Sequence, residues 1–198
     1  MEGRREHPRY ALVAPLPRAL EVRIEDLFLG LLGTSKPIMG YHITLVGPFM
    51  WLAEPDEARL GRVSELCATW PPFAVRLWGL SAFRAANSNA VYIPAHEAED
   101  LIELHRVLGA ILDPAIALQR ELPEQGYLPH VTLGLGLMDS ELERVMADAQ
   151  ERGLDERFMV DEIHLIEERP SAPWRRIRAF PMERPTPSLS AAIQAHER

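Results

Sequence analysis

A four-residue pattern occurs twice in this chain, and the two copies begin 88 positions apart. The sequence is H-I-T-L at 42–45 and H-V-T-L at 130–133. Side chains in an extended strand alternate between two faces, so a histidine and a threonine two residues apart point the same way. Each copy therefore predicts a strand that presents an imidazole and a hydroxyl on one face and buries aliphatic residues on the other.

Two such strands facing each other across a cleft would surround one ligand with two acid–base groups and two hydroxyl donors. This set suits a phosphodiester, because its cleavage requires one proton to be removed, one proton to be delivered and the phosphate oxygens to be held. Considered singly, His42 and His130 are more typical of structural strand histidines, and Thr44 and Thr132 of ordinary strand residues. The pairing of the two motifs favours the functional interpretation.

Composition and length are typical of a soluble globular protein with a sizeable core. The chain has 198 residues, of which 47% are hydrophobic and 25% charged, which fits one domain or two small lobes that share a core. We expect residues 1–182 to form a single bilobal domain and residues 183–198 to form a polar, proline-containing tail. The single cysteine, Cys67, excludes an internal disulfide and a cysteine-cluster metal site, and we expect it to be buried in a helix.

The net charge argues against a protein that binds long duplex nucleic acid. Such binders are usually basic, whereas this chain carries a formal charge of −8. A small phosphate ester or an RNA end needs a local positive field, which arginine can supply because it grips phosphate oxygens with two parallel hydrogen bonds. No segment reaches the roughly 20 apolar residues of a membrane span, and no export signal is visible, so we expect a cytoplasmic protein. We also expect a monomer.

Hydrophobic periodicity predicts alternating strands and helices, which give an α+β fold. The expected strands cover residues 9–14, 41–46, 73–83, 90–93, the second tetrad, 158–167 and 174–182, and the expected helices cover 18–32, 55–69, 98–112 and a segment to 152. Ser140 and Glu143 form a candidate capping box for the last helix. Each histidine strand is followed by a helix and a hairpin, so we predict two pseudo-symmetric lobes with mostly antiparallel sheets, flanked by helices, and a groove between the lobes.

The paired motifs resemble those of the two-histidine (2H) phosphoesterase superfamily, and most closely its branch of 2′-5′ RNA ligases and RNA 2′,3′-cyclic phosphodiesterases. The resemblance runs from about residue 9 to 182. It includes H-I-T-L-V-G-P-F at 42–49, Y-L-P-H-V-T-L-G at 127–134 and the closing W-R-R-I-R-A-F-P-M at 174–182. Trp174 stands where an aromatic residue such as tyrosine is common in the family.

The resemblance implies a site and a reaction. His42 and His130 would be the catalytic pair, Thr44 and Thr132 would bind the phosphate, and neither a metal nor a cofactor would be needed. By analogy with the family, His42 would donate a proton and His130 would accept one. The two tetrads are alike, so the residues themselves leave this assignment open.

Other residues are weaker candidates for substrate contacts. Tyr41 and Tyr127 flank the motifs and could stack on a base or pack in the core. Arg175 and Arg176 could supply positive charge, or could lie on a solvated edge strand. A few remaining positions carry ionisable groups without a supporting pattern: Lys36 in the loop before the first motif, His164 in a strand that could reach the groove, and His7, His96, His105 and His196.

The expected function is hydrolysis of a 2′,3′-cyclic phosphate on an RNA end or a small nucleotide. Two alternatives use the same groups: a phosphodiesterase that acts on 2′-5′ linked oligonucleotides, and one that acts on ADP-ribose cyclic phosphate. A third alternative belongs to another class, a nucleotide-binding module without turnover. The two intact tetrads favour an enzyme over the module.

Overall fold

The structure of the chain is a computed structural model that describes residues 7–29, 40–85, 88–118, 126–150, 154–169 and 172–183. Within these ranges the strands are β1 (Arg9–Pro15), β2 (His42–Trp51), β3 (Phe73–Trp78), β4 (Ser81–Phe83), β5 (Asn89–His96), β6 (Ile116–Leu118), β7 (His130–Leu137), β8 (Asp155–Val160), β9 (Glu162–Glu168) and β10 (Arg175–Pro181). The helices are α1 (Arg18–Ile24), its π-helical continuation η1 (Glu25–Leu29), α3 (Glu57–Thr69), α4 (Glu99–Leu112) and α5 (Asp139–Gln150).

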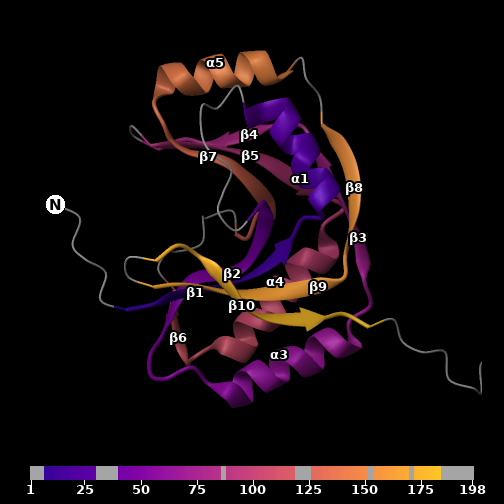
Figure 1. Ribbon diagram of the computed structural model, residues 1–198, viewed down its shortest axis with the longest axis vertical. Coiled ribbons are helices and arrows are strands. Elements are labelled where there is room, and N and C mark those ends of the chain that lie inside the picture. The colour runs from indigo at the N-terminus through magenta and orange to yellow at the C-terminus, as the bar shows by residue number, and fades with distance from the viewer. Residues whose placement is uncertain are drawn as a thin grey trace, which may run out of the picture.

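The strands pair antiparallel in the order β10-β9-β1-β2-β7-β5-β3-β8, with β4 added to β5 and β6 added to β2. The sheet curls, with α3 and α4 at one end of the molecule and α5 at the other (Figure 1). We call the strands from β10 to β2 the first lobe and those from β7 to β8 the second lobe. The α+β prediction, with antiparallel sheets and flanking helices, is confirmed.

The helices bury the faces that their sequence periodicity predicts. α4 buries a row of leucines three or four residues apart, Leu101, Leu104, Leu108 and Leu112, as an amphipathic helix on a sheet should. α3 buries Leu60, Val63 and Cys67. Burial raises the pKa of the Cys67 thiol to about 11, so this cysteine is an inert core residue.

The sheet of the first lobe has one face covered by helices and one open face. Tyr10, Leu12 and Ala14 of β1 belong to the main core. Ala11 and Val13 point the other way, since side chains alternate along a strand, and form a separate small cluster with Ile166. The side chains of His42 and Thr44 on β2 lie on this second face, because Val13 pairs with Thr44 and Pro15 pairs with His42.

Two predicted strands are broken in the structure. The strand predicted at 158–167 is two strands: β8 ends at Val160, β9 begins at Glu162, and Asp161 lies between them. β8 pairs with β3 in the second lobe whereas β9 pairs with β1 in the first, so the chain crosses between lobes here. The strand predicted at 73–83 is interrupted at Gly79, whose φ of +73° favours glycine and turns the chain between β3 and β4.

Helix ends and one short strand also differ from the predictions. The helix predicted at 18–32 is α-helical to Ile24 and π-helical to Leu29, and residues 30–39 lie outside the described ranges. The predicted capping box at Ser140 and Glu143 is wrong, because α5 begins at Asp139, two residues earlier than an N-cap at Ser140 implies, and Glu141 accepts the Met138 N–H at 2.8 Å. The short strand β6 (Ile116–Leu118) lies outside the strands and helices that the sequence predicts. Residues 184–198 of the predicted tail are not described, and no helix in the described ranges has the length and apolar content of a membrane span.

We predict opposite effects of alanine at two glycines. Gly47 has a φ of +130°, and a Cβ there would lie 3.0 Å from both the Cα of Ala11 and the carbonyl oxygen of Tyr10. Gly61 lies inside α3, where an added Cβ meets no other described atom within 4 Å. Gly47→Ala should lower the free energy of unfolding by about 1–3 kcal/mol, and Gly61→Ala should raise it by about 0.5–1 kcal/mol. Urea denaturation midpoints measure both, and equal midpoints for the two variants would contradict this account.

Candidate active site

The structure brings the two tetrads together at the junction of the two lobes. β2 and β7 run antiparallel and are paired through Ile43 and Val131. The residues on either side of this pair alternate to the opposite face, so His42, Thr44, His130 and Thr132 share one face around it. The two histidines occupy diagonal positions, which lie about 7–8 Å apart in a regular antiparallel pair. An anion the size of a phosphate fits between groups at that separation.

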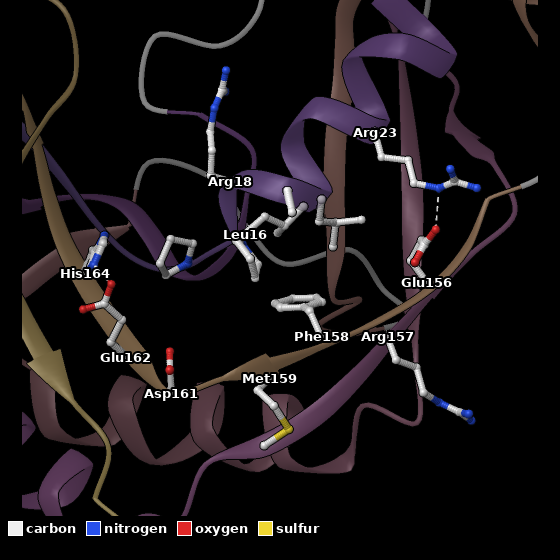
Figure 2. Close-up of a pocket in the computed structure, with 14 residues that line it drawn as sticks. Leu16, Arg18, Arg23, Glu156, Arg157, Phe158, Met159, Asp161, Glu162 and His164 are labelled. Carbon is white, nitrogen blue, oxygen red and sulfur yellow. Dashed lines mark ion pairs between the residues drawn. The ribbon is translucent and has the colours of Figure 1, made fainter.

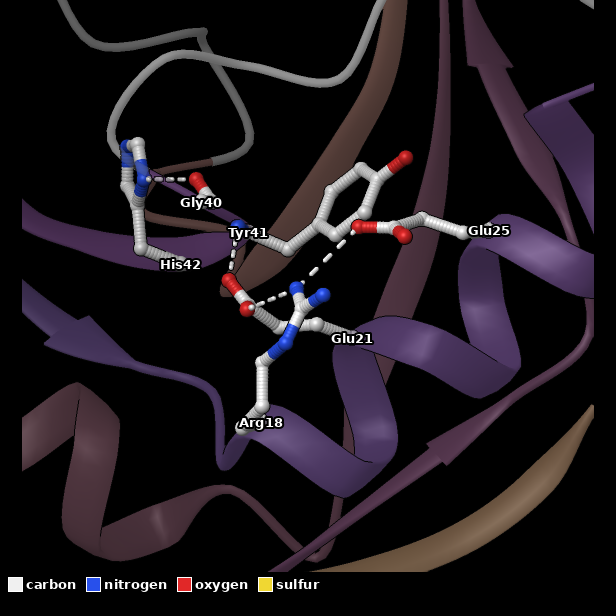
Figure 3. Close-up of polar contacts among 6 residues, drawn as sticks. All are labelled: Arg18, Glu21, Glu25, Gly40, Tyr41 and His42. Carbon is white, nitrogen blue, oxygen red and sulfur yellow. Dashed lines mark hydrogen bonds and ion pairs between the residues drawn. The ribbon is translucent and has the colours of Figure 1, made fainter.

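Each histidine ring is oriented by a carbonyl two residues earlier. The Nδ1 of His42 lies 3.1 Å from the Gly40 oxygen, and the Nδ1 of His130 lies 2.7 Å from the Leu128 oxygen. The first of these bonds is visible in Figure 3. A carbonyl oxygen can only accept, so Nδ1 carries the hydrogen in both rings. In the neutral form, Nε2 of each ring is therefore the nitrogen with a free lone pair.

Both histidines have a pKa below the ordinary value for histidine. Burial is the main cause in each case, because it disfavours the charged imidazolium. The carbonyl bonds at Gly40 and Leu128 act in the opposite direction. The pKa of His42 is lowered further by His130 and raised by Glu21.

Aromatic rings surround His130. Phe83 and Tyr92 each have a ring centroid 5.0 Å from that of His130, and they stack on each other at 4.2 Å. Tyr92 is opposite Thr132 in the sheet, and the strand that carries Phe83 pairs with the same strand β5. Neither Phe83 nor Tyr92 is a predicted site residue. Their strand positions relative to His130 depend on which strands pair, which the sequence pattern does not give.

Tyr127 and His105 fix the strand that carries the first tetrad. The Tyr127 hydroxyl donates to the Thr44 carbonyl at 2.8 Å, and the His105 Nδ1 donates to the Leu45 carbonyl at 2.6 Å. The two rings stack with their centroids 3.9 Å apart. Tyr127, predicted as a possible substrate contact, thus has a structural partner beside the site. No sequence pattern supports a role for His105, but the structure gives it a specific bond on β2.

A row of paired residues extends the site across the first lobe. Thr44 pairs with Val13, and Val13 pairs with His164. Paired residues share a face, so the His164 side chain lies on the same face as Thr44. Its Nε2 is 2.7 Å from Glu162 and 3.4 Å from Arg176. Arg176 is therefore the predicted arginine that the structure places on this face.

The structure separates Arg175 and Tyr41 from the histidine face. Arg175 bonds Glu167 at 2.9 Å, and the same carboxylate accepts the Tyr10 hydroxyl, whose side chain belongs to the core on the helix-covered side. Tyr41 is 3% exposed and packs in the core. These positions do not support contacts between either residue and a substrate in the groove. Lys36 lies outside the described residues.

A cavity of about 750 Å³ adjoins the histidine face. Neither His42 nor His130 lines it, but Pro15, which pairs with His42 across β1 and β2, does, and so does His164. Figure 2 shows Leu16 and Arg18 on one side of it and Asp161 and Glu162 on the other. The lining is mixed, with arginines, carboxylates and apolar groups. In the described ranges, no three metal-ligating side chains gather as they would around a metal ion.

Comparison with known proteins identifies the family. A family model described as the 2′-5′ RNA ligase superfamily matches residues 19–196. The chain belongs to the 2′-5′ RNA ligase superfamily. This confirms the resemblance to 2H phosphoesterases that the two tetrads carry.

Two relatives of this superfamily member are bacterial proteins named "Putative phosphoesterase". The protein of Bacillus licheniformis is 25% identical over 140 residues, which cover 70% of this chain and 78% of that protein. The protein of Bacillus pumilus is 28% identical over 140 residues, which cover 70% of this chain and 77% of that protein.

Solved structures share the fold of this superfamily member. Escherichia coli LigT complexed with 3′-AMP matches with a TM-score of 0.60 and 18% identity over 90% of this chain and 100% of LigT. The protein TT0787 of Thermus thermophilus matches with a TM-score of 0.56 and 19% identity, over 88% of this chain and 97% of that one. Kluyveromyces marxianus Usb1 matches with a TM-score of 0.54 and 15% identity, over 89% of this chain and 98% of Usb1.

The ring geometry predicts the protonation behaviour of both histidines in solution. His42 and His130 should titrate below the reference pKa of about 6.5, because burial disfavours the imidazolium. Above their pKa both rings should be Nδ1–H tautomers, since Nδ1 donates to a carbonyl in each. Long-range ¹H–¹⁵N NMR over a pH series reads both properties. An Nε2–H tautomer in either ring, or a pKa above 6.5, would contradict the geometry.

Proposed function

We propose that this superfamily member is a metal-independent phosphodiesterase that hydrolyses the 2′,3′-cyclic phosphate of an RNA end or a small nucleotide. The observation that carries the proposal is the matched pair of imidazoles on one face of the β2–β7 junction. Both rings use Nδ1 to bond a carbonyl, so Nε2 of each is the atom for proton transfer.

The proton balance of this reaction needs two groups in opposite states. Water attacks phosphorus, a new P–O bond forms, and the bond from phosphorus to one ribose oxygen breaks. A neutral imidazole takes the proton of the water, and a protonated imidazole gives one to the departing ribose oxygen. Because the histidines supply both functions, the reaction needs no metal-bound hydroxide or Lewis acid.

Hydroxyl groups and an arginine would stabilise the charge that grows on the phosphate oxygens. The side chains of Thr44 and Thr132 share the face of the imidazoles and can donate to the non-bridging oxygens. Arg176, beside His164 on the same face of the first lobe, adds positive charge. We assign these three residues to phosphate binding.

The surroundings of the site support a nucleotide as substrate. The cavity of about 750 Å³ beside Pro15 and His164 has space for a ligand of this size. LigT, which shares the fold, has been crystallised with 3′-AMP, ATP and NADP⁺. The chain's formal charge of −8 favours a small or single-stranded ligand over a long duplex.

Removing either imidazole should abolish turnover. Purified wild type should hydrolyse 2′,3′-cyclic nucleotides equally well with and without a chelator. His42→Ala and His130→Ala should each lose about 10²–10⁴-fold in kcat/KM, the usual contribution of a positioned acid or base. His7→Ala, an exposed histidine at the start of the described chain, is the matched control.

The same assay, run against a panel of substrates, separates the alternatives. The panel includes 2′-5′ linked oligonucleotides and ADP-ribose 1″,2″-cyclic phosphate. Faster turnover of either would reassign the substrate but keep the site. Nucleotide binding without turnover in wild type would favour a binding module, and turnover that survives both histidine substitutions would reject the site.

The threonine hydroxyls should matter for the chemical step. Thr44→Val and Thr132→Val keep the side-chain shape but remove the donors, and each should lower kcat by about tenfold or more with a smaller effect on KM. Thr69→Val is the control, because the Thr69 hydroxyl donates to the Leu66 carbonyl at 3.0 Å near the end of α3. A change in KM with unchanged kcat would show that the hydroxyls contribute to ground-state binding instead.

A further inference from the structure

The two histidines make the same kind of ring hydrogen bond, but the peptide units that accept these bonds differ in their own partners. The carbonyl that orients His42 belongs to the peptide unit between Gly40 and Tyr41, and the N–H of the same unit donates to Glu21 Oε1 at 2.9 Å. The carbonyl that orients His130 belongs to the peptide unit between Leu128 and Pro129. Proline has no N–H, so no carboxylate can bind that unit in the same way.

We infer, on the basis of the proposed function, that Glu21 is a positioning residue that acts through the 40–41 peptide and biases His42 toward the proton-donating role. A carboxylate on the N–H polarises the amide and makes its carbonyl a stronger acceptor. The stronger acceptor holds the Nδ1–H of His42 more firmly and favours the imidazolium. His130 lacks this support and packs edge-on against the stacked rings of Phe83 and Tyr92, which suits a neutral ring that accepts a proton.

The local structure is built around this carboxylate. Gly40 has a φ of +75°, and a Cβ at this position would collide with Glu21 Oε1. A glycine thus gives the carboxylate access to the peptide next to the histidine. Glu21 comes from α1, whereas Gly40 and Tyr41 lead into β2, so the contact joins two elements (Figure 3).

Arg18 forms an ion pair with the Glu21 carboxylate oxygen that does not bind the peptide. Its Nη1 is 3.2 Å from Glu21 Oε2 and 3.4 Å from Glu25 Oε1. The Glu21 side chain is 12% exposed whereas that of Arg18 is 67% exposed, so Glu21 is the sheltered member of the pair. The ion pair with Arg18 fixes the position of the carboxylate next to the peptide.

The other ionisable groups around His42 do not provide the same effect. His130 on β7 is itself an imidazole and lowers the pKa of His42, whereas Glu21 raises it. Other described ionisable groups on the elements around the site are Arg18 and Arg23 on α1, Glu25 at the start of η1, Tyr127 and His105 against β2, Tyr92 beside His130, and Glu162, His164 and Arg176 on the first-lobe sheet.

Three variants test the inference. Glu21→Gln keeps an oxygen that can accept the Tyr41 N–H but removes the charge, and Glu21→Ala removes both. Arg18→Gln removes the ion pair of Arg18 with the Glu21 carboxylate but leaves the carboxylate itself in place. Glu25→Gln is the matched control, because it removes another carboxylate that pairs with Arg18. Thermal unfolding of each variant checks that the fold is retained.

The measured quantities are the pH profile of kcat/KM on a 2′,3′-cyclic nucleotide and the NMR titration of both histidines. A proton donor must be protonated, so activity falls as pH rises through its pKa. Loss of the negative charge lowers the pKa of His42, which moves the alkaline limb of the profile to lower pH. Glu21→Gln should therefore lose roughly three- to tenfold in kcat/KM on the alkaline side and little on the acidic side. Glu21→Ala should lose more, and Glu25→Gln should follow wild type.

The two readouts distinguish failure of this inference from failure of the proposed function. A lower pKa for His42 and an unchanged pKa for His130 in Glu21→Gln support the inference, even if wild type hydrolyses no compound in the panel. An unchanged His42 titration overturns it, as does an equal shift in Glu25→Gln, which would show an effect of helix charge in general. A shift of His130 in place of His42 also overturns it.

Discussion

The site depends on the pairing of Ile43 with Val131, where the strand of one lobe meets the strand of the other. Both residues are fully buried, so their side chains fix the face on which the histidines and threonines stand. A shift of the register by one residue would send these polar groups into the core. Next to this pair, Tyr127 and His105 donate to the Thr44 and Leu45 carbonyls of β2.

Much of the fold could be predicted from the sequence because its signals are local. The leucines of α4 repeat at helical spacing, and each tetrad alternates polar and apolar residues as a half-buried strand does. The break at Asp161 was missed because residues 158–167 are continuously compatible with a strand, and the chain leaves one lobe for the other without a strong turn signal. The choice of partner strand is a long-range property, so periodicity does not reveal it.

The site shows the same division between local and long-range information. Alternation along each tetrad predicts that its histidine and threonine share a face, and the repeat predicts that two such faces meet. Alternation also predicts that Arg175 and Arg176 point in opposite directions, but the pairing of β10 with β9 is needed to know which one faces the groove. The contrast between Tyr41 and Pro129 is visible in the sequence, yet its meaning depends on the carboxylate that α1 brings to one of the two peptides.

The order of strands in the first lobe has a consequence for assembly during synthesis. β1 is the first strand of the described chain, but its pairing with β9 joins Leu12 to Leu165. The row that begins at Thr44 therefore lacks its outer strands until most of the polypeptide has left the ribosome. Contacts between such distant segments make folding slow relative to helical proteins of this size. Until β9 has been synthesised, the edge of β1 that pairs with it has no partner strand and is open to pairing with other chains.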